Sequence, residues 1–404
     1  MGFRLFSRKE RDKEGGPLLR KLEQEPRNRE LLEEVILYFE GERRYERALE
    51  YLDRLIDVDP DNVWLRVRAG RLLRKARRFE EAVVRLEEAA AAAADNLDVQ
   101  LGLVKSLLAL GRIDEAERLT LHMVNGNPEV PLCHYALGIL RARQERNDDA
   151  IEAYRRALEL DPEFARAHAN LGLLHDRNGD VDLALTHFRR AIRAEPERAE
   201  WHLNLGAVYG EKKMIREALA EFQEALRLDP KNVEAHFNIG MIYHDQGSFE
   251  EAIREFRIAL DAEPDNIKAH YLLGRAYIRR GLYDRARKQM NKVLSLDPDN
   301  AKAFYYLGVA ENKQENVEDA IAALEHAIAI NPGDERPYYV LGIAYDKKGA
   351  GDKARQAYRT ADRLLQERTL PASAVSDGAA FSGSRLTFLP AELGGSAGEK
   401  EPAE

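Results

Sequence analysis

Asparagine and histidine recur at a fixed spacing in the middle of this 404-residue chain. The sequence reads HANLG at 168–172, HLNLG at 202–206 and HFNIG at 236–240, so each copy lies 34 residues after the previous one. Imidazole nitrogens are common metal ligands, and a carboxamide both donates and accepts hydrogen bonds. Metal binding and peptide binding are therefore the chemistries to consider first.

The histidines belong to a column of five at one register. A zinc ion needs nitrogens about 2.0–2.1 Å away, whereas packed helices lie about 8–10 Å apart. Neighbouring members of the column therefore cannot share an ion, and we interpret them as packing residues. His175 and His244 lie in other registers and complete no ligand set, so we predict no metal site and no cofactor. The column consists of His134, His168, His202, His236 and His270.

Three further columns show that the whole chain is periodic. Prolines recur at intervals of 34 residues or twice 34, alanines recur at every interval, and glycines occupy eight of ten places, with Ile36 and Val104 in the other two. The prolines are Pro26, Pro60, Pro128, Pro162, Pro196, Pro230, Pro264, Pro298 and Pro332. The alanines are Ala48, Ala82, Ala116, Ala150, Ala184, Ala218, Ala252, Ala286, Ala320 and Ala354. The glycines are Gly70, Gly138, Gly172, Gly206, Gly240, Gly274, Gly308 and Gly342.

The stretch NPEVPLCHYALGILRARQERNDDAIEAYRRALELDP resembles the tetratricopeptide repeat, a helix–turn–helix unit of 34 residues. Leu137, Gly138, Ala150, Tyr154 and Ala157 stand where the family pattern has them. With each proline counted as position 32, glycine falls at position 8 of a first helix and alanine at position 20 of a second. The resemblance implies an all-α fold, a right-handed α-solenoid of about ten repeats.

The periodicity divides the chain into four parts. We expect a basic flexible N-terminus at 1–16, a capping helix at 17–28, repeats over 29–368 and a disordered tail at 369–404, whose apolar stretch RLTFLPAEL is expected to dock on its own or a neighbouring chain. The ten predicted units are 29–62, 63–96, 97–130, 131–164, 165–198, 199–232, 233–266, 267–300, 301–334 and 335–368.

Composition and motifs argue against catalysis. The net charge is -9, and the single cysteine, Cys133, excludes an intramolecular disulfide. The sequence contains no nucleophile elbow, phosphate-binding loop or metalloprotease motif. No apolar run approaches the roughly 20 residues of a membrane-spanning helix, and the first residues lack a secretory signal. We predict a non-enzymatic protein and a cytoplasmic location.

The asparagines at position 6, Asn170, Asn204 and Asn238, lie about 200° around the helix from the glycine. By resemblance, this face lines the hollow of the superhelix, and the repeat array of O-GlcNAc transferases holds peptide backbone there with an asparagine column. We expect no catalytic domain of that kind here, since 36 residues follow residue 368. Two interpretations stay open: a peptide-binding ladder, or asparagines that bond to a neighbouring helix.

The same face is basic near the front of the repeats and mixes basic residues with tyrosine near the end. A surface that binds acidic, extended segments has this composition, because tyrosine and arginine are favoured anchors; a solvated helix face has it too. The candidate residues are Arg68, Arg71 and Lys75 in the second repeat and Lys268, Tyr271, Arg275, Tyr305 and Tyr306 in the eighth and ninth repeats.

These patterns predict a scaffold or adaptor that binds extended peptide segments of partner proteins. Two alternatives remain: a peripheral membrane or assembly factor, in which the start FRLFSRK makes a weak membrane contact, and the interaction subunit of an enzyme complex. Self-association is compatible with a solenoid. No nucleic-acid partner is expected, given the overall acidity.

Overall fold

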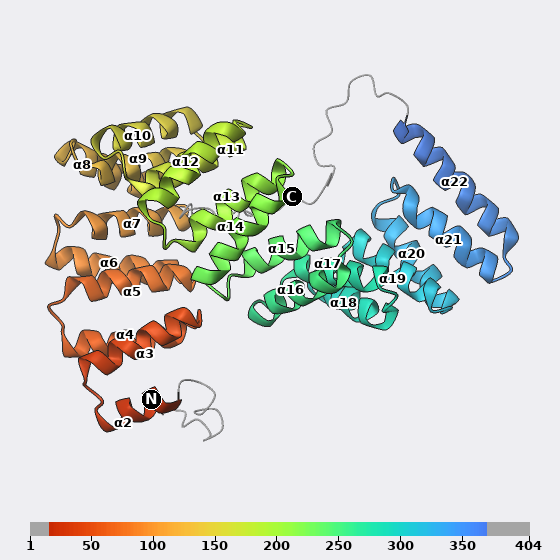
Figure 1. The fold of residues 1–404 in the computed structure, drawn as a ribbon, viewed down its shortest axis with the longest axis horizontal. Coiled ribbons are helices and arrows are strands. Elements are labelled where there is room, and N and C mark those ends of the chain that lie inside the picture. The colour runs from red at the N-terminus through yellow and green to blue at the C-terminus, as the bar shows by residue number, and fades with distance from the viewer. Residues whose placement is uncertain (1–15, 370–404) are drawn as a thin grey trace. The chain divides into compact units, whose positions relative to one another are not determined.

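The computed structural model describes residues 16–369, which form 21 helices and no strand (Figure 1). The predicted all-α helix–turn–helix architecture is confirmed. The segments FRLFSRK and RLTFLPAEL lie outside the described residues. Among the helices from residue 16 to 369, none has both the length and the apolar character needed to cross a bilayer.

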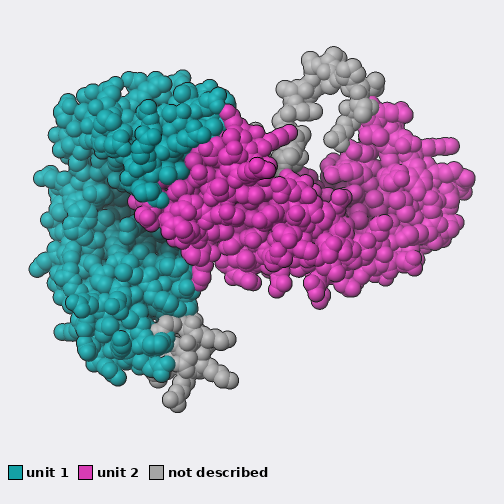
Figure 2. Space-filling model, viewed as in Figure 1, with its two compact units in different colours: residues 1–196, 390–404 teal, residues 197–389 magenta. Residues whose placement is uncertain are grey.

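The chain divides into two compact units, and each is described by itself (Figure 2). Of the described residues, the first contains 16–196 and the second contains 197–369. The first contains α2 Gly16–Gln24, α3 Arg29–Gly41, α4 Tyr45–Val58, α5 Val63–Lys75, α6 Phe79–Ala92, α7 Leu97–Ala109, α8 Ile113–Gly126, α9 Pro131–Arg143, α10 Asn147–Leu160, α11 Ala165–Arg177 and α12 Val181–Ala194. The second contains α13 Ala199–Glu211, α14 Ile215–Leu228, α15 Val233–Asp245, α16 Phe249–Ala262, α17 Ile267–Arg279, α18 Tyr283–Leu296, α19 Ala301–Lys313, α20 Val317–Ile330, α21 Glu335–Lys347 and α22 Gly351–Thr369.

Each interval of 34 residues holds one helix A and one helix B. Asparagine begins many of the A helices: the Asn232 side chain accepts a hydrogen bond from the N–H of Ala235 at 2.9 Å, and Asn266 does the same for Ala269 at 3.0 Å. Such a cap satisfies an N–H that lacks a partner within the helix. The same cap forms at Asn28, Asn62, Asn96 and Asn300.

The turn from helix A to helix B needs a residue with left-handed backbone conformation at position 15 in all ten repeats. Five repeats place glycine there, and five place another residue with a φ between 56° and 65°. A left-handed residue costs little for glycine but roughly 1–2 kcal/mol for others. The glycines are Gly111, Gly179, Gly247, Gly281 and Gly349, and the others are Arg43, Arg77, Glu145, Lys213 and Glu315.

The glycine at position 8 allows a large side chain of helix B to pack directly on helix A. A Cβ on Gly172 would lie 2.9 Å from the Phe188 ring, and one on Gly206 would lie 2.8 Å from the Phe222 ring. Both rings are fully buried. The helix loses about 1 kcal/mol at each glycine, but the close approach lets the ring fill the space between the helices.

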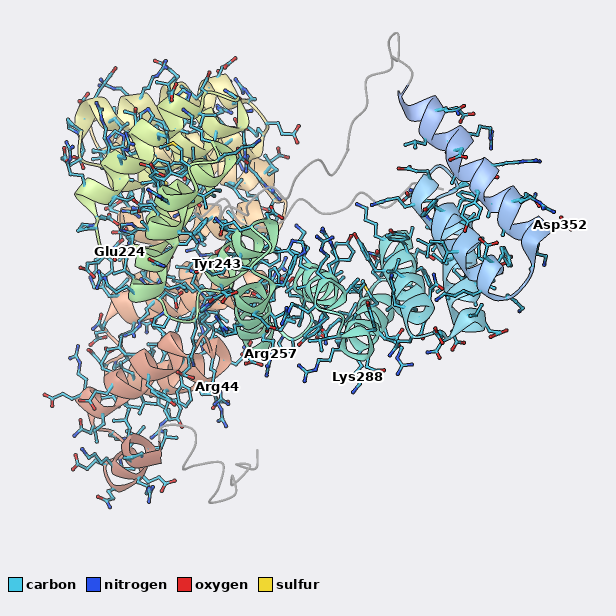
Figure 3. All side chains as sticks on the ribbon, turned by 45° about the vertical axis from the view of Figure 1, so that its right-hand side comes forward. Arg44, Glu224, Tyr243, Arg257, Lys288 and Asp352 are labelled. Carbon is cyan, nitrogen blue, oxygen red and sulfur yellow. The ribbon has the colours of Figure 1, made fainter. Side chains whose placement is uncertain are left out.

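Small residues on helix B complete this contact. The alanines at position 20 are 0–1% exposed in every repeat. Charged side chains lie on the opposite side of the helices; Arg257, Lys288 and Asp352 point outward into solvent (Figure 3). The burial pattern therefore follows the 34-residue period, because every repeat buries the same face.

Replacing Gly172 by alanine tests the close contact. We expect the free energy of unfolding to fall by about 1–3 kcal/mol, because a methyl group placed against the Phe188 ring overpacks the core. Chemical denaturation measures the change. Gly41→Ala is the matched control, since nothing lies within 4 Å of its added Cβ; it should stabilise by about 0.5–1 kcal/mol through helix propensity. Equal effects of the two substitutions would contradict the packing argument.

Candidate functional site

The histidines at position 4 form hydrogen bonds with the turn that precedes their own repeat. One ring nitrogen, Nε2, lies within hydrogen-bond distance of a proline carbonyl six residues earlier: 3.0 Å for His168, 3.1 Å for His236 and 2.8 Å for His270. The imidazole N–H donates and the carbonyl accepts. The bond satisfies a carbonyl at the end of helix B, where the helix offers no partner.

The other nitrogen, Nδ1, meets the side chain at position 23 of helix B. The partner is Glu221 for His202 at 2.7 Å and Glu255 for His236 at 2.6 Å. For His168 it is another histidine, His187, at 2.9 Å. Both ring nitrogens of His168 and His236 therefore bond within the protein. Nowhere in residues 16–369 are three or more histidine, cysteine or acidic side chains placed to hold a metal ion.

The partner at position 23 decides how each histidine responds to protons. Burial lowers the pKa of His187 to about 4, and the neighbouring His168 and His175 add to this effect. Burial also lowers the pKa of His168. Burial opposes protonation of His236 as well, but its hydrogen bonds to Glu255 and to the Pro230 carbonyl outweigh burial and raise its pKa.

Cys133 is also a packing residue. Its side chain is fully buried in α9, and burial raises the pKa of the thiol. A thiol with a raised pKa is a poor nucleophile at neutral pH.

The asparagines at position 6 are all 0% exposed. Asn170 donates from Nδ2 to the hydroxyl of Tyr154 on α10 at 3.0 Å, and its Oδ1 has no partner. Neither the Nδ2 nor the Oδ1 of Asn204 has a hydrogen-bond partner. Asn170 thus makes the bond to a neighbouring helix that one interpretation of the column expects, whereas Asn204 makes no such bond.

The basic residues of the second repeat do not act as one group. Arg68 bonds to Glu33 at 2.5 Å and to Glu40 at 2.7 Å, and its side chain is 15% exposed. The expectation that Arg68 lies on an exposed face is therefore wrong, because two carboxylates from α3 hold it. Arg71 and Lys75 are exposed, and the Lys75 ammonium lies 5.7 Å from the centre of the Tyr45 ring.

The tyrosine and arginine residues of the second unit do come together. Tyr271 and Tyr306 meet edge to face at 5.6 Å between ring centroids, and Tyr305 lies 4.8 Å from Tyr306. The Arg275 guanidinium lies 5.7 Å from both the Tyr271 and Tyr306 rings. We call Tyr271, Arg275, Tyr305 and Tyr306 the tyrosine–arginine cluster. Lys268 is exposed on the same helix as Tyr271, and no contact joins it to the cluster.

One arginine has an environment that its sequence register does not reveal. Arg74 on α5 lies in the basic stretch RVRAGRLLRKARR, yet its Nε atom is buried and has no hydrogen-bond partner. Tyr135 on α9, which the sequence reasoning missed, is 1% exposed and is surrounded by cations. The sequence does not single Tyr135 out, because the same position of helix A is also aromatic at Phe237, Tyr271, Tyr305 and Tyr339.

Two sequence models of the tetratricopeptide repeat match the chain. One matches residues 135–199, 173–213, 215–267 and 271–335. The other matches residues 40–88, 73–139 and 312–376. Together they cover most of the helical part.

Curated relatives match over a limited stretch. Human protein O-mannosyl-transferase TMTC1 is 30% identical over 120 residues, which are 30% of this chain and 13% of that protein. Human TMTC3 is 28% identical over 137 residues, 30% of this chain and 15% of that protein. Among solved structures, the APC/C hetero-tetramer Cut9–Hcn1 has a TM-score of 0.57 at 20% identity, covering 74% of this chain and 58% of that chain, a likeness that shows the fold.

The histidine pairs should give α12 and α16 opposite responses to acid. The fold favours the neutral form of His187. Its contribution to stability is therefore present above the unfolded pKa near 6.5 and is lost as pH falls toward about 4. Between pH 7.5 and 5.0, the free energy of opening α12 should fall by roughly 1–2 kcal/mol more in the wild type than in the His187→Gln variant. Hydrogen exchange of the α12 amides measures this difference.

His236 supplies the control, because its pKa is raised. The contribution of His236 to stability is present below the unfolded pKa and is lost as pH rises through the folded pKa. His236→Gln should therefore weaken α16 more at pH 5.0 than at pH 7.5. The same pH response in wild type and in both variants would refute the assignment.

Proposed function

Since this chain belongs to the tetratricopeptide repeat family, a fold suited to protein–protein interaction, we propose that it is a non-enzymatic adaptor. In this proposal, the A helices of the second unit bind an extended peptide segment of a partner protein. The binding surface consists of the asparagines at position 6 of α13 and α15 and the tyrosine–arginine cluster on α17 and α19.

The observation that carries the proposal is the Asn204 carboxamide. It is fully buried, and none of its polar atoms has a hydrogen-bond partner. A buried amide without partners costs roughly 1–3 kcal/mol, and alanine would be the better helix former. A residue with this cost is expected where a ligand supplies the missing partners, and peptide N–H and C=O groups match a carboxamide whatever the peptide side chains are.

The spacing of the helices suits an extended ligand. The A helices α13, α15, α17 and α19 contact one another in sequence. Helices about 8–10 Å apart meet an extended strand, which rises about 3.3 Å per residue, at roughly every third residue. Asn204 and Asn238 would thus contact the backbone, and the tyrosine–arginine cluster would receive a side chain farther along the same segment.

The peripheral-membrane alternative has no observation among the described residues to carry it. The proposed membrane contact depends on FRLFSRK, which lies outside the described residues. Mannosyl transfer is not carried over from TMTC1, because the aligned stretch is 13% of that protein.

Replacing Asn204 and Asn238 together by alanine tests the proposal. Peptides that bind the full chain are first selected from an array of 12-residue sequences, and their affinity is then measured by calorimetry. The double variant should lose about 1–3 kcal/mol of binding free energy, at one hydrogen bond per asparagine. It should lose no stability at position 204, where no bond is broken.

Asn170→Ala is the matched control, because Asn170 already bonds to Tyr154. This variant should lower the free energy of unfolding by about 0.5–1.5 kcal/mol and leave binding to the second unit unchanged. Unchanged peptide affinity in the double variant, together with a lower melting temperature, would make the asparagines packing residues and refute the proposal.

A further inference from the structure

Arg74 on α5 is a half-buried cation without a counter-charge. No ion pair or hydrogen bond joins its guanidinium to any described residue, and its Nε atom is inaccessible to solvent. Burial lowers the pKa of Arg74 to about 10; the nearby Tyr135 opposes this shift and Arg71 adds to it. Arg74 therefore stays protonated at neutral pH. Arg68, on the same helix, has two carboxylate partners by contrast.

Two more cations lie around the same tyrosine. The Lys105 ammonium on α7 is 5.4 Å from the centre of the Tyr135 ring, and the Arg166 guanidinium on α11 is 5.6 Å from it. Arg166 also lies 5.2 Å from the Phe164 ring, which meets Tyr135 edge to face. The A helices of four successive repeats of the first unit thus bring Arg74, Lys105, Tyr135 and Arg166 together, and we call these residues the cationic cluster.

Charges of like sign in a region of low dielectric repel one another and lose hydration. The tyrosine ring offsets part of this cost for Lys105 and Arg166 through cation–π attraction. No carboxylate of residues 16–369 bonds to Arg74 or Arg166, and the Nε of Arg74 has no hydrogen-bond partner. An arrangement of this kind favours an anionic ligand.

We propose that the cationic cluster is a binding site for carboxylate side chains of an extended acidic segment of a partner protein. A guanidinium presents paired N–H donors in a geometry that matches a carboxylate, and Arg74 has these donors unused. The inference rests on the proposed function, because it names the chemistry of the bound segment.

The site differs from the basic surface that the sequence indicates. That surface includes Arg68, which is already neutralised by Glu33 and Glu40. The structure assigns recognition to Arg74, six residues farther along α5, together with residues of three other repeats. A segment that reaches all of them would cross four A helices, which requires an extended conformation.

The test uses the full chain and two fluorescein-labelled peptides of 12 residues, one alternating Glu with Ala and one alternating Gln with Ala. Fluorescence anisotropy at low salt should give at least about tenfold tighter binding of the Glu peptide. Arg74→Met should remove about tenfold of that affinity and leave the Gln peptide unaffected. Arg66→Met, which removes one charge from the same helix, should change either affinity less than about twofold.

Circular dichroism of each variant checks that the helices and the melting temperature are retained. Arg166→Met serves as an independent second variant, and it should weaken the Glu peptide in the same way. Wild-type affinity for the Glu peptide in both variants would overturn the inference. So would tighter, Arg74-dependent binding of a twelve-nucleotide single-stranded thymidine oligomer, which would make nucleic acid the ligand.

The result with the Gln peptide separates the two proposals. If both peptides bind equally well and the Asn204 and Asn238 substitutions weaken both, the adaptor function stands and the acidic site fails. If neither peptide binds the wild-type chain, both proposals fail.

Discussion

The close approach of the two helices within each repeat is the constraint on which the rest of the structure depends. In eight of the ten repeats a glycine on helix A provides the space for a side chain of helix B, as at Gly172 and Phe188. Where position 8 is the larger Val104, position 24 is the smaller Thr120. In the first repeat Ile36 and Leu52 fill the two positions, and both are fully buried.

This contact orients every other column. With positions 8 and 20 facing each other, position 4 of helix A lies beside position 23 of helix B, so histidine can bond there to Glu221, Glu255 or His187. The same bond therefore joins helix A to helix B in every case. The partner of the histidine decides whether acid destabilises the repeat, as with His187, or does not, as with Glu255. A periodic framework thus carries local differences that leave the backbone unchanged.

The face of helix A that the helix pair does not use differs between the two units. In the first unit it carries Arg74, Lys105 and Arg166 around Tyr135, and in the second it carries a buried carboxamide and the tyrosine–arginine cluster. Unsatisfied polar groups destabilise a protein. Their position on one face of neighbouring A helices agrees with selection for binding, since substitution by an apolar residue would stabilise the fold.

The sequence alone determined the repeat period, the all-α architecture and the packing role of the glycine and alanine columns, because each repeat buries the same face and so needs the same residue sizes. It also brought Tyr271, Arg275, Tyr305 and Tyr306 forward as candidates, since like positions of adjacent repeats lie side by side. Only the tertiary structure decided which cations are neutralised. Arg68 and Arg74 are equivalent by composition, but carboxylates from another repeat reach Arg68 and none reaches Arg74. The period specifies which backbone positions are neighbours, whereas the pairing of long charged side chains depends on distances of a few ångström between helices that are far apart in sequence.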